Sequence, residues 1–178
     1  MKKIFLIILL FVFKNNSMVQ KIELTERGLA IIEIGTRINE NEIKGIESIK
    51  NYTNKGKICF GLPDKYNYYF LNFDSISITS IGLVKDIFIV SDNSNTVINI
   101  FIFLKDTNGK LTSALSEIFD SPKLSSQSSI GIIDTVSQKF WSKNNISVIV
   151  RTNADSEYTK ISMHRSMNEN NFSGVYNY

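Results

Sequence analysis

Apolar residues crowd into two neighbouring segments of the chain, and their spacing predicts a β-hairpin. Residues 83–91 are rich in Ile, Val and Phe, and residues 96–104 have the same character. The residues between them, 92–95, all favour turns. In the second strand, one face is predicted to carry Val97, Phe101 and Phe103, and the other Ile98, Ile100, Ile102 and Leu104. Apolar side chains on both faces predict a central strand that is covered on both sides.

A helix is predicted to follow this hairpin over residues 111–119. Residues 106–109 form a polar turn before it, and Pro122 disfavours helix for the residue that precedes it. The apolar residues that recur at helical spacing on one side are Leu111, Ala114, Leu115, Ile118 and Phe119. We expect this helix to cover one face of the hairpin. The N-terminal third of the chain or a second copy of the protein would cover the other.

The last third of the chain is predicted to form a three-stranded meander over residues 138–141, 146–152 and 158–165. Short polar turns join these segments. The residues predicted to face inward are Ile146, Val148 and Val150 in the middle strand and Thr159, Ile161 and Met163 in the last. The residues predicted to face outward from the last strand are Tyr158, Lys160, Ser162 and His164.

The remaining segments have weaker patterns. Isoleucines three residues apart predict a helix over residues 40–50, although Gly45 weakens it. The aromatic-rich residues 66–73 and the shorter stretch 76–79 are predicted to be strands. The serine-rich residues 121–129 are predicted to form one long polar loop.

Together these elements predict an α+β fold, in which one or two helices pack on one face of a largely antiparallel sheet. No linker rich in Pro, Gly or Ser divides the chain into two halves. We therefore expect a single domain over residues 20–166, followed by a polar tail over residues 167–178.

Residues 1–19 are predicted to be a secretory signal peptide. Lys2 and Lys3 precede an unbroken apolar run over residues 4–13, which is the form of such a segment. This run is about half of the roughly 20 residues that a spanning helix needs, so no stable membrane span is expected after signal removal. Cleavage after Ser17 and cleavage after Val19 are both open. The alternatives are an uncleaved N-terminus and a first core strand or helix over residues 4–13.

Charge and cysteine content narrow the class of protein. The whole chain has 20 Lys and Arg against 17 Asp and Glu, a formal net charge of +3. Lys2, Lys3 and Lys14 precede any plausible cleavage site, so their removal leaves 17 residues of each sign. Without a basic cluster, no nucleic-acid partner is expected. Cys59 is the single cysteine, so an internal disulfide framework is excluded.

Candidate catalytic groups are few. His164 is the only histidine, which excludes most metal sites, and no metal site or cofactor is predicted. Cys59 lies between apolar neighbours and is interpreted as a buried inert thiol. The chain has no glycine-rich nucleotide-binding loop and no nucleophile elbow. We therefore predict no catalytic residues, although scattered carboxylates leave the question of an enzyme open.

The sequence predicts an exported bacterial protein, periplasmic or extracellular, that binds a protein or glycan partner or has a structural role without catalysing a reaction. Tyrosines are favoured at binding surfaces. The predicted partner-binding residues are Tyr66, Tyr68, Phe70, Tyr158, Lys160 and His164. One alternative is a periplasmic immunity-type protein that neutralises a secreted toxin. Another is a small hydrolase that uses carboxylates or Cys59. The sequence leaves the oligomeric state open.

Overall fold

The computed structural model describes residues 19–49, 65–72, 76–79, 81–105, 110–130, 134–153 and 158–165. Within these ranges the chain forms thirteen strands and one helix, α2 (Leu111–Phe119). The strands are β1 (Gln20–Ile22), β2 (Leu24–Thr25), β3 (Gly28–Leu29), β4 (Ile32–Glu33), β5 (Ile46–Ser48), β6 (Asn67–Leu71), β7 (Ile76–Ile78), β8 (Gly82–Ser91), β9 (Val97–Leu104), β10 (Leu124–Ile130), β11 (Asp134–Lys143), β12 (Ile146–Asn153) and β13 (Thr159–Arg165). The predicted signal segment up to residue 18, Cys59 and the predicted tail lie outside the described residues.

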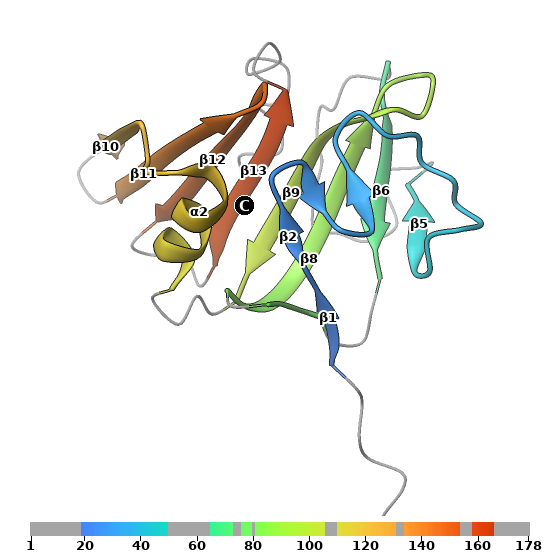
Figure 1. Cartoon of the computed structure of the whole chain (residues 1–178), viewed down its shortest axis with the longest axis horizontal. Coiled ribbons are helices and arrows are strands. Elements are labelled where there is room, and N and C mark those ends of the chain that lie inside the picture. The colour runs from blue at the N-terminus through green and yellow to red at the C-terminus, as the bar shows by residue number, and fades with distance from the viewer. Residues whose placement is uncertain are drawn as a thin grey trace, which may run out of the picture.

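Ten of these strands form one large sheet (Figure 1). Its order is β1-β7-β8-β9-β13-β12-β11-β10, and β5 joins through β6. The long strand β8 pairs with β7 at its start and with β6 along its second half, while β9 lies along its other edge. All these pairs are antiparallel except β1 with β7, so the predicted antiparallel sheet is confirmed.

The predicted α+β class is wrong, because the described chain is mostly β. One reason is the segment 40–50, where spaced isoleucines predicted a helix. Gly45 instead adopts a φ of 78°, which interrupts any helix, and Ile46–Ser48 forms β5. β5 pairs with β6, with Ile46 opposite Leu71. Pairing with an aromatic-rich strand therefore outweighs a weak helical pattern.

The serine-rich segment is the second reason. The long polar loop predicted over 121–129 is wrong, since Leu124–Ile130 forms β10 and pairs with β11 along its whole length. Strand pairing is made by backbone groups, so a neighbouring strand can recruit a polar segment whose side chains show no alternation. β10 ends the strand order of the sheet, a position where polar residues are common.

The strongest sequence patterns are confirmed. β8 and β9 form the predicted hairpin, and α2 has the predicted bounds, with Leu111, Ala114, Leu115 and Phe119 buried. β11, β12 and β13 form the predicted meander. The turn between β11 and β12 has positive φ at Asn144 and Asn145, the conformation that a two-residue hairpin turn requires.

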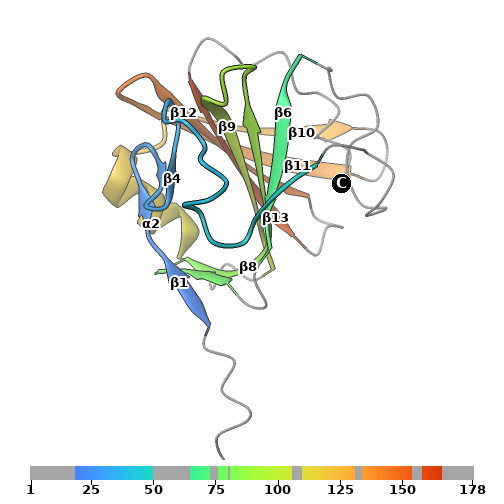
Figure 2. The ribbon, with the colours of Figure 1, turned by 90° about the vertical axis from the view of Figure 1, so that its right-hand side faces the viewer.

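One face of the large sheet, here called the helix-side face, is covered by two elements. α2 lies over the strands β11 to β13, and the small sheet β2-β3-β4 lies in front of β8 and β9 (Figure 1). In the turned view, α2 and β4 lie on the same side of the large sheet (Figure 2). Their apolar residues join one core cluster that includes Leu29 and Ile32 from the small sheet, Leu115 from α2, and Ile102 and Val148 from the large sheet.

The opposite face of the sheet carries a second cluster, here called the aromatic face: Tyr68, Phe88, Val90, Phe101 and Phe103. β8 and β9 are therefore buried on both faces, which was predicted for β9. The expectation that the helix covers this hairpin is wrong, because α2 lies over β11 to β13 and the small sheet covers β8 and β9 instead. The predicted division of β9 is wrong at one end, because Val97 joins the helix-side core and Ile98 packs against the aromatic face. A register shift between Val90 and Ser91 causes this reversal, since a β-bulge changes which side chains point to each face.

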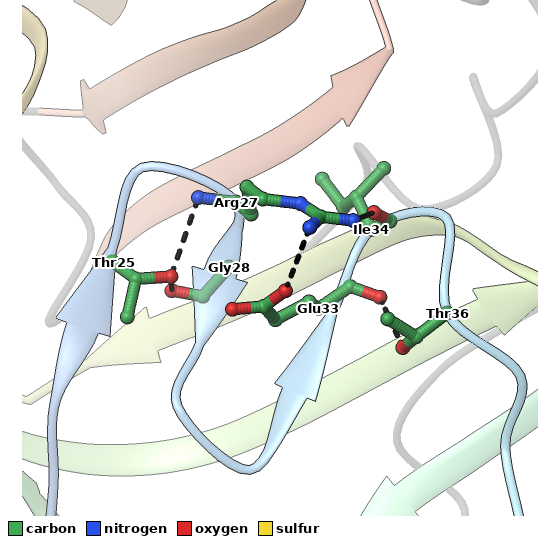
Figure 3. Close-up of polar contacts among 6 residues, drawn as sticks. All are labelled: Thr25, Arg27, Gly28, Glu33, Ile34 and Thr36. Atoms are coloured by element: carbon green, nitrogen blue, oxygen red, sulfur yellow. Dashed lines mark hydrogen bonds and ion pairs between the residues drawn. The ribbon is translucent and has the colours of Figure 1, made fainter. Parts of the chain in front are cut away.

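The small sheet β2-β3-β4 is tied together by side-chain contacts (Figure 3). Arg27 Nη1 lies 3.3 Å from Glu33 Oε2, and the other terminal nitrogen of Arg27 donates to the carbonyl of Ile34 at 3.5 Å. Thr36 Oγ1 donates to the carbonyl of Glu33 at 2.7 Å. These bonds hold two tight turns so that Leu29, Ile32 and Ile34 can point into the core.

Gly28→Ala is expected to destabilise the protein by about 2–3 kcal/mol. Gly28 has a φ of 148°, and a Cβ there would lie 2.7 Å from the carbonyl oxygen of Ile32 and 2.9 Å from Cδ1 of Ile100. The small sheet would have to move away from β9. Chemical denaturation measures the loss, and Ile31→Ala, at an exposed neighbouring position, should change stability by no more than about 0.5 kcal/mol. Equal stability of the two variants would contradict this packing.

Candidate functional site

Three inward residues of β11 attach α2 to the sheet. Lys139 Nζ donates to Thr112 Oγ1 at 3.0 Å, and Trp141 Nε1 donates to Ser116 Oγ at 3.3 Å. Lys143 Nζ donates to the carbonyl of Ile118 at 2.9 Å, near the end of the helix. Alternate residues of a strand share one face, so these three side chains follow α2 from its first turn to its last. The sequence pattern Lys-x-Trp-x-Lys thus fixes how the helix lies on the sheet.

A cavity of about 300 Å³ lies where α2 begins over the sheet. Among the described residues, its lining consists of Leu111 and Thr112 from α2, Ser137 and Lys139 from β11, Val150 and Thr152 from β12, and Thr159 from β13. We call it the hydroxyl pocket, because four of these seven residues carry hydroxyl groups. Leu111 and Val150 are buried, whereas Thr152 is exposed and the other four are half-buried. Solvent therefore reaches the polar wall of the pocket.

Strand register places three of the hydroxyl residues in one row. Ser137 pairs with Thr152, and Thr152 pairs with Thr159, so the row crosses β11, β12 and β13. Cross-strand neighbours have Cβ atoms about 4.5–5.5 Å apart, which gives a row roughly 10 Å long. One step further along β11 and β12, Lys139 stands directly opposite Val150. The pocket therefore has a hydroxyl edge, an apolar floor and one ammonium group.

The described lining of this pocket carries positive charge. The seven lining residues that the structure describes include one cation and no carboxylate. Among the ion pairs of the described ranges, Lys139 takes part in none, and its one hydrogen bond there goes to Thr112. The first turn of α2 also carries no acidic residue. The pocket is consequently suited to a ligand with acceptor groups or negative charge.

The aromatic face presents a different arrangement on the other side of the sheet. The Phe88 ring lies 5.8 Å from that of Tyr68, 5.2 Å from that of Phe70 and 6.0 Å from that of Phe101. Lys160 continues this series on β13, with Nζ 5.3 Å from the Phe101 ring. Aromatic rings and a cation thus form a continuous band across β6, β8, β9 and β13.

Lys160 is unusual because its ammonium group is buried. Its residue is 9% exposed, and burial lowers the pKa of Lys160 from 10.5 to about 7. Charge repulsion from Arg151, its direct neighbour across β12 and β13, is the smaller of the two causes of this lowered pKa. Both effects disfavour the protonated form.

Five of the six predicted partner-binding residues lie on this one face, namely Tyr66, Tyr68, Phe70, Lys160 and His164. The ring of the sixth, Tyr158, lies 3.5 Å from Nζ of Lys85. Tyr66, Tyr68 and Phe70 come from β6 and its start, and Tyr158, Lys160 and His164 from β13 and its start. The solvent-exposed position expected for Lys160 and His164 is wrong, since they are 9% and 1% exposed. The two faces of β13 were predicted correctly. The face opposite the helix-side core, where Lys160 and His164 lie, is buried as well. Partner binding by the six residues stays a prediction.

Sequence reasoning missed the hydroxyl pocket. A usable signal was present, because Lys139, Thr152 and Thr159 are polar residues on the core side of predicted strands, and Ser137 directly precedes one of these strands. Polar groups at such positions need partners or a cavity. Locating that cavity also required the position of α2, which no local pattern gives.

Within the described ranges, no cluster of three or more His, Cys, Asp or Glu side chains is placed to hold a metal ion. Two of the scattered carboxylates form ion pairs: Glu26 lies within ion-pair distance of Lys143, and Glu33 within ion-pair distance of Arg27.

No protein-family model, curated protein or solved structure matches this chain.

Proposed function

We propose that this chain is an exported, non-enzymatic binding protein that holds a small polar ligand in the hydroxyl pocket. One observation carries the proposal: a solvent-accessible cavity of about 300 Å³ whose wall combines four hydroxyl residues and one ammonium group. Small-molecule sites are concave, with a few placed polar groups on a largely preformed frame. Here three paired strands and a helix attached by hydrogen bonds provide that frame.

The composition of the described lining favours binding over turnover. None of these seven residues is a carboxylate or an imidazole, the groups that most often act as the general base for a hydroxyl nucleophile. Export is supported by the basic start and apolar run of residues 1–13. Within the described ranges, no helix has the length and apolar character required to cross a membrane.

A ligand of this pocket is expected to stabilise the folded chain. Saturation at 100 times the dissociation constant should add about 2.7 kcal/mol to the free energy of unfolding. The mature protein would be screened by thermal shift and ligand-detected NMR against monosaccharides, hydroxy acids, amino acids and sugar phosphates. Thr152→Trp, at the exposed rim of the pocket, should abolish the effect. Leu83→Trp, at an exposed position on β8, should not.

Two results would contradict the proposed function. If no compound in the panel binds, the pocket is not a small-molecule site of these classes. If binding persists unchanged in Thr152→Trp, the ligand occupies another place. Conversion of a bound compound into products would favour the hydrolase alternative, and co-purification of a secreted toxin from the periplasm would favour the immunity alternative.

A further inference from the structure

We propose that the ligand of the hydroxyl pocket is a small polyhydroxylated carboxylate of the sugar-acid type. This inference rests on the proposed function and adds the chemical class of the ligand. Its basis is the combination of Lys139 with the hydroxyl row Ser137, Thr152 and Thr159.

The ammonium group of Lys139 favours a ligand with negative charge. A protonated lysine carries three donors and no acceptor. Lys139 makes one hydrogen bond in the described part of the chain, to Thr112, and no ion pair there. Since no carboxylate is found among the described lining residues, an anionic ligand group would complete the site with a charge-assisted hydrogen bond to Lys139. A cationic ligand would meet repulsion at the same atom.

The hydroxyl row selects a hydroxylated ligand. A Ser or Thr hydroxyl can both donate and accept, so a row of three such groups complements a series of ligand hydroxyls. The row is roughly 10 Å long, enough to follow one sugar ring. Leu111 and Val150 provide an apolar floor for the C–H face of such a ring.

The size of the pocket limits the ligand to about one sugar unit. A volume of about 300 Å³ equals roughly ten water molecules at ~30 Å³ each. A carboxylate fits this pocket better than a phosphate, because the part of the lining that the structure describes provides one cation and no arginine. Phosphate groups are typically bound by several donors, with arginine favoured.

The test compares ligands that share a ring and differ in charge. Titration of the mature protein with D-glucuronate, D-glucose, D-glucosamine and glucose 6-phosphate would be followed by calorimetry or NMR. We expect glucuronate to bind about tenfold more tightly than glucose, which corresponds to about 1.4 kcal/mol. Glucosamine should bind most weakly, and glucose 6-phosphate less tightly than glucuronate.

Substitutions of Lys139 test whether its Nζ causes the preference for glucuronate over glucose. Lys139→Met should reduce glucuronate affinity about tenfold and change glucose affinity by less than about threefold. Lys139→Arg should retain the preference for glucuronate. Lys143→Met is the matched control, because Lys143 lies on the same strand and face but contacts the other end of α2. It should leave both affinities unchanged, and thermal melting would confirm that every variant is folded.

The outcomes separate this inference from the proposed function. If glucose binds as tightly as glucuronate or more tightly, and Thr152→Trp abolishes this binding, the sugar-acid class is overturned but the small-molecule pocket stands. Tighter binding of glucose 6-phosphate would overturn it in favour of a phosphate ligand. A glucuronate preference that survives in Lys139→Met would overturn the role of this ammonium group. Failure of every compound in the larger panel would overturn both proposals.

Discussion

Trp141→Ala is expected to lower the free energy of unfolding by about 3–5 kcal/mol, the largest effect of any single substitution considered in this protein. Trp141 is fully buried and is the largest of the fully buried side chains. Its removal would leave a cavity under α2 in addition to the loss of apolar contact. The indole N–H also donates to Ser116 Oγ at 3.3 Å, so one link between the helix and β11 would disappear.

Two further variants separate packing from hydrogen bonding at this position. Trp141→Phe keeps an aromatic ring but removes the donor, and Ser116→Ala removes only the acceptor. We expect Ser116→Ala to cost about 1 kcal/mol and Trp141→Phe to fall between that value and the loss in Trp141→Ala. Urea denaturation of the three variants measures these differences. A loss below about 1 kcal/mol in Trp141→Ala would show that α2 does not depend on this contact.

Lys160→Met is expected to make the stability of the protein less dependent on pH. In the folded chain, burial lowers the pKa of Lys160 to about 7, against 10.5 for an ordinary lysine. Between these two pH values the unfolded chain binds the extra proton, so the stability of the unmodified protein rises with pH, by about 1.4 kcal/mol per unit from this group. Below pH 7 both states are protonated, and the unfavourable burial of the ammonium group is fully present.

The measurement is the difference in unfolding free energy between Lys160→Met and the unmodified protein from pH 6 to pH 10. The variant should be more stable by a few kcal/mol at pH 6, and this advantage should shrink as the pH rises. Arg151 and Asp86 also carry charge on this face, so both proteins must be compared at each pH. Lys105→Met, at an exposed position, should show no such trend. A constant difference between variant and unmodified protein would mean that Lys160 does not titrate in this range.

The elements that sequence patterns predicted well are those with strong local signals. The β8-β9 hairpin has two apolar segments around a polar turn, and α2 has a complete apolar stripe before Pro122. In both cases nearby residues suffice, because the alternation of side chains follows directly from strand and helix geometry. The facing of β13 was predicted for the same reason, with Ile161 and Met163 toward the helix-side core.

The errors occur where a distant segment decides the outcome. Ile46–Ser48 became a strand through pairing with β6, and the serine-rich Leu124–Ile130 through pairing with β11. The reversal at Val97 and Ile98 comes from a register shift against β8. Local propensities differ by less than about 1 kcal/mol, so pairing with a distant strand can override them.

The candidate site shows the same division. Residue identities alone excluded a metal site with two histidines and a disulfide framework, since the chain has one histidine and one cysteine. They also predicted the faces of β13 and of most of β9. The export segment stays a prediction. The hydroxyl pocket required tertiary structure, because α2 and three strands contribute its seven residues. The local sequence of a strand or helix determines which way its side chains point. A cavity exists only between such elements, so its position depends on how the helix and the strands pack together.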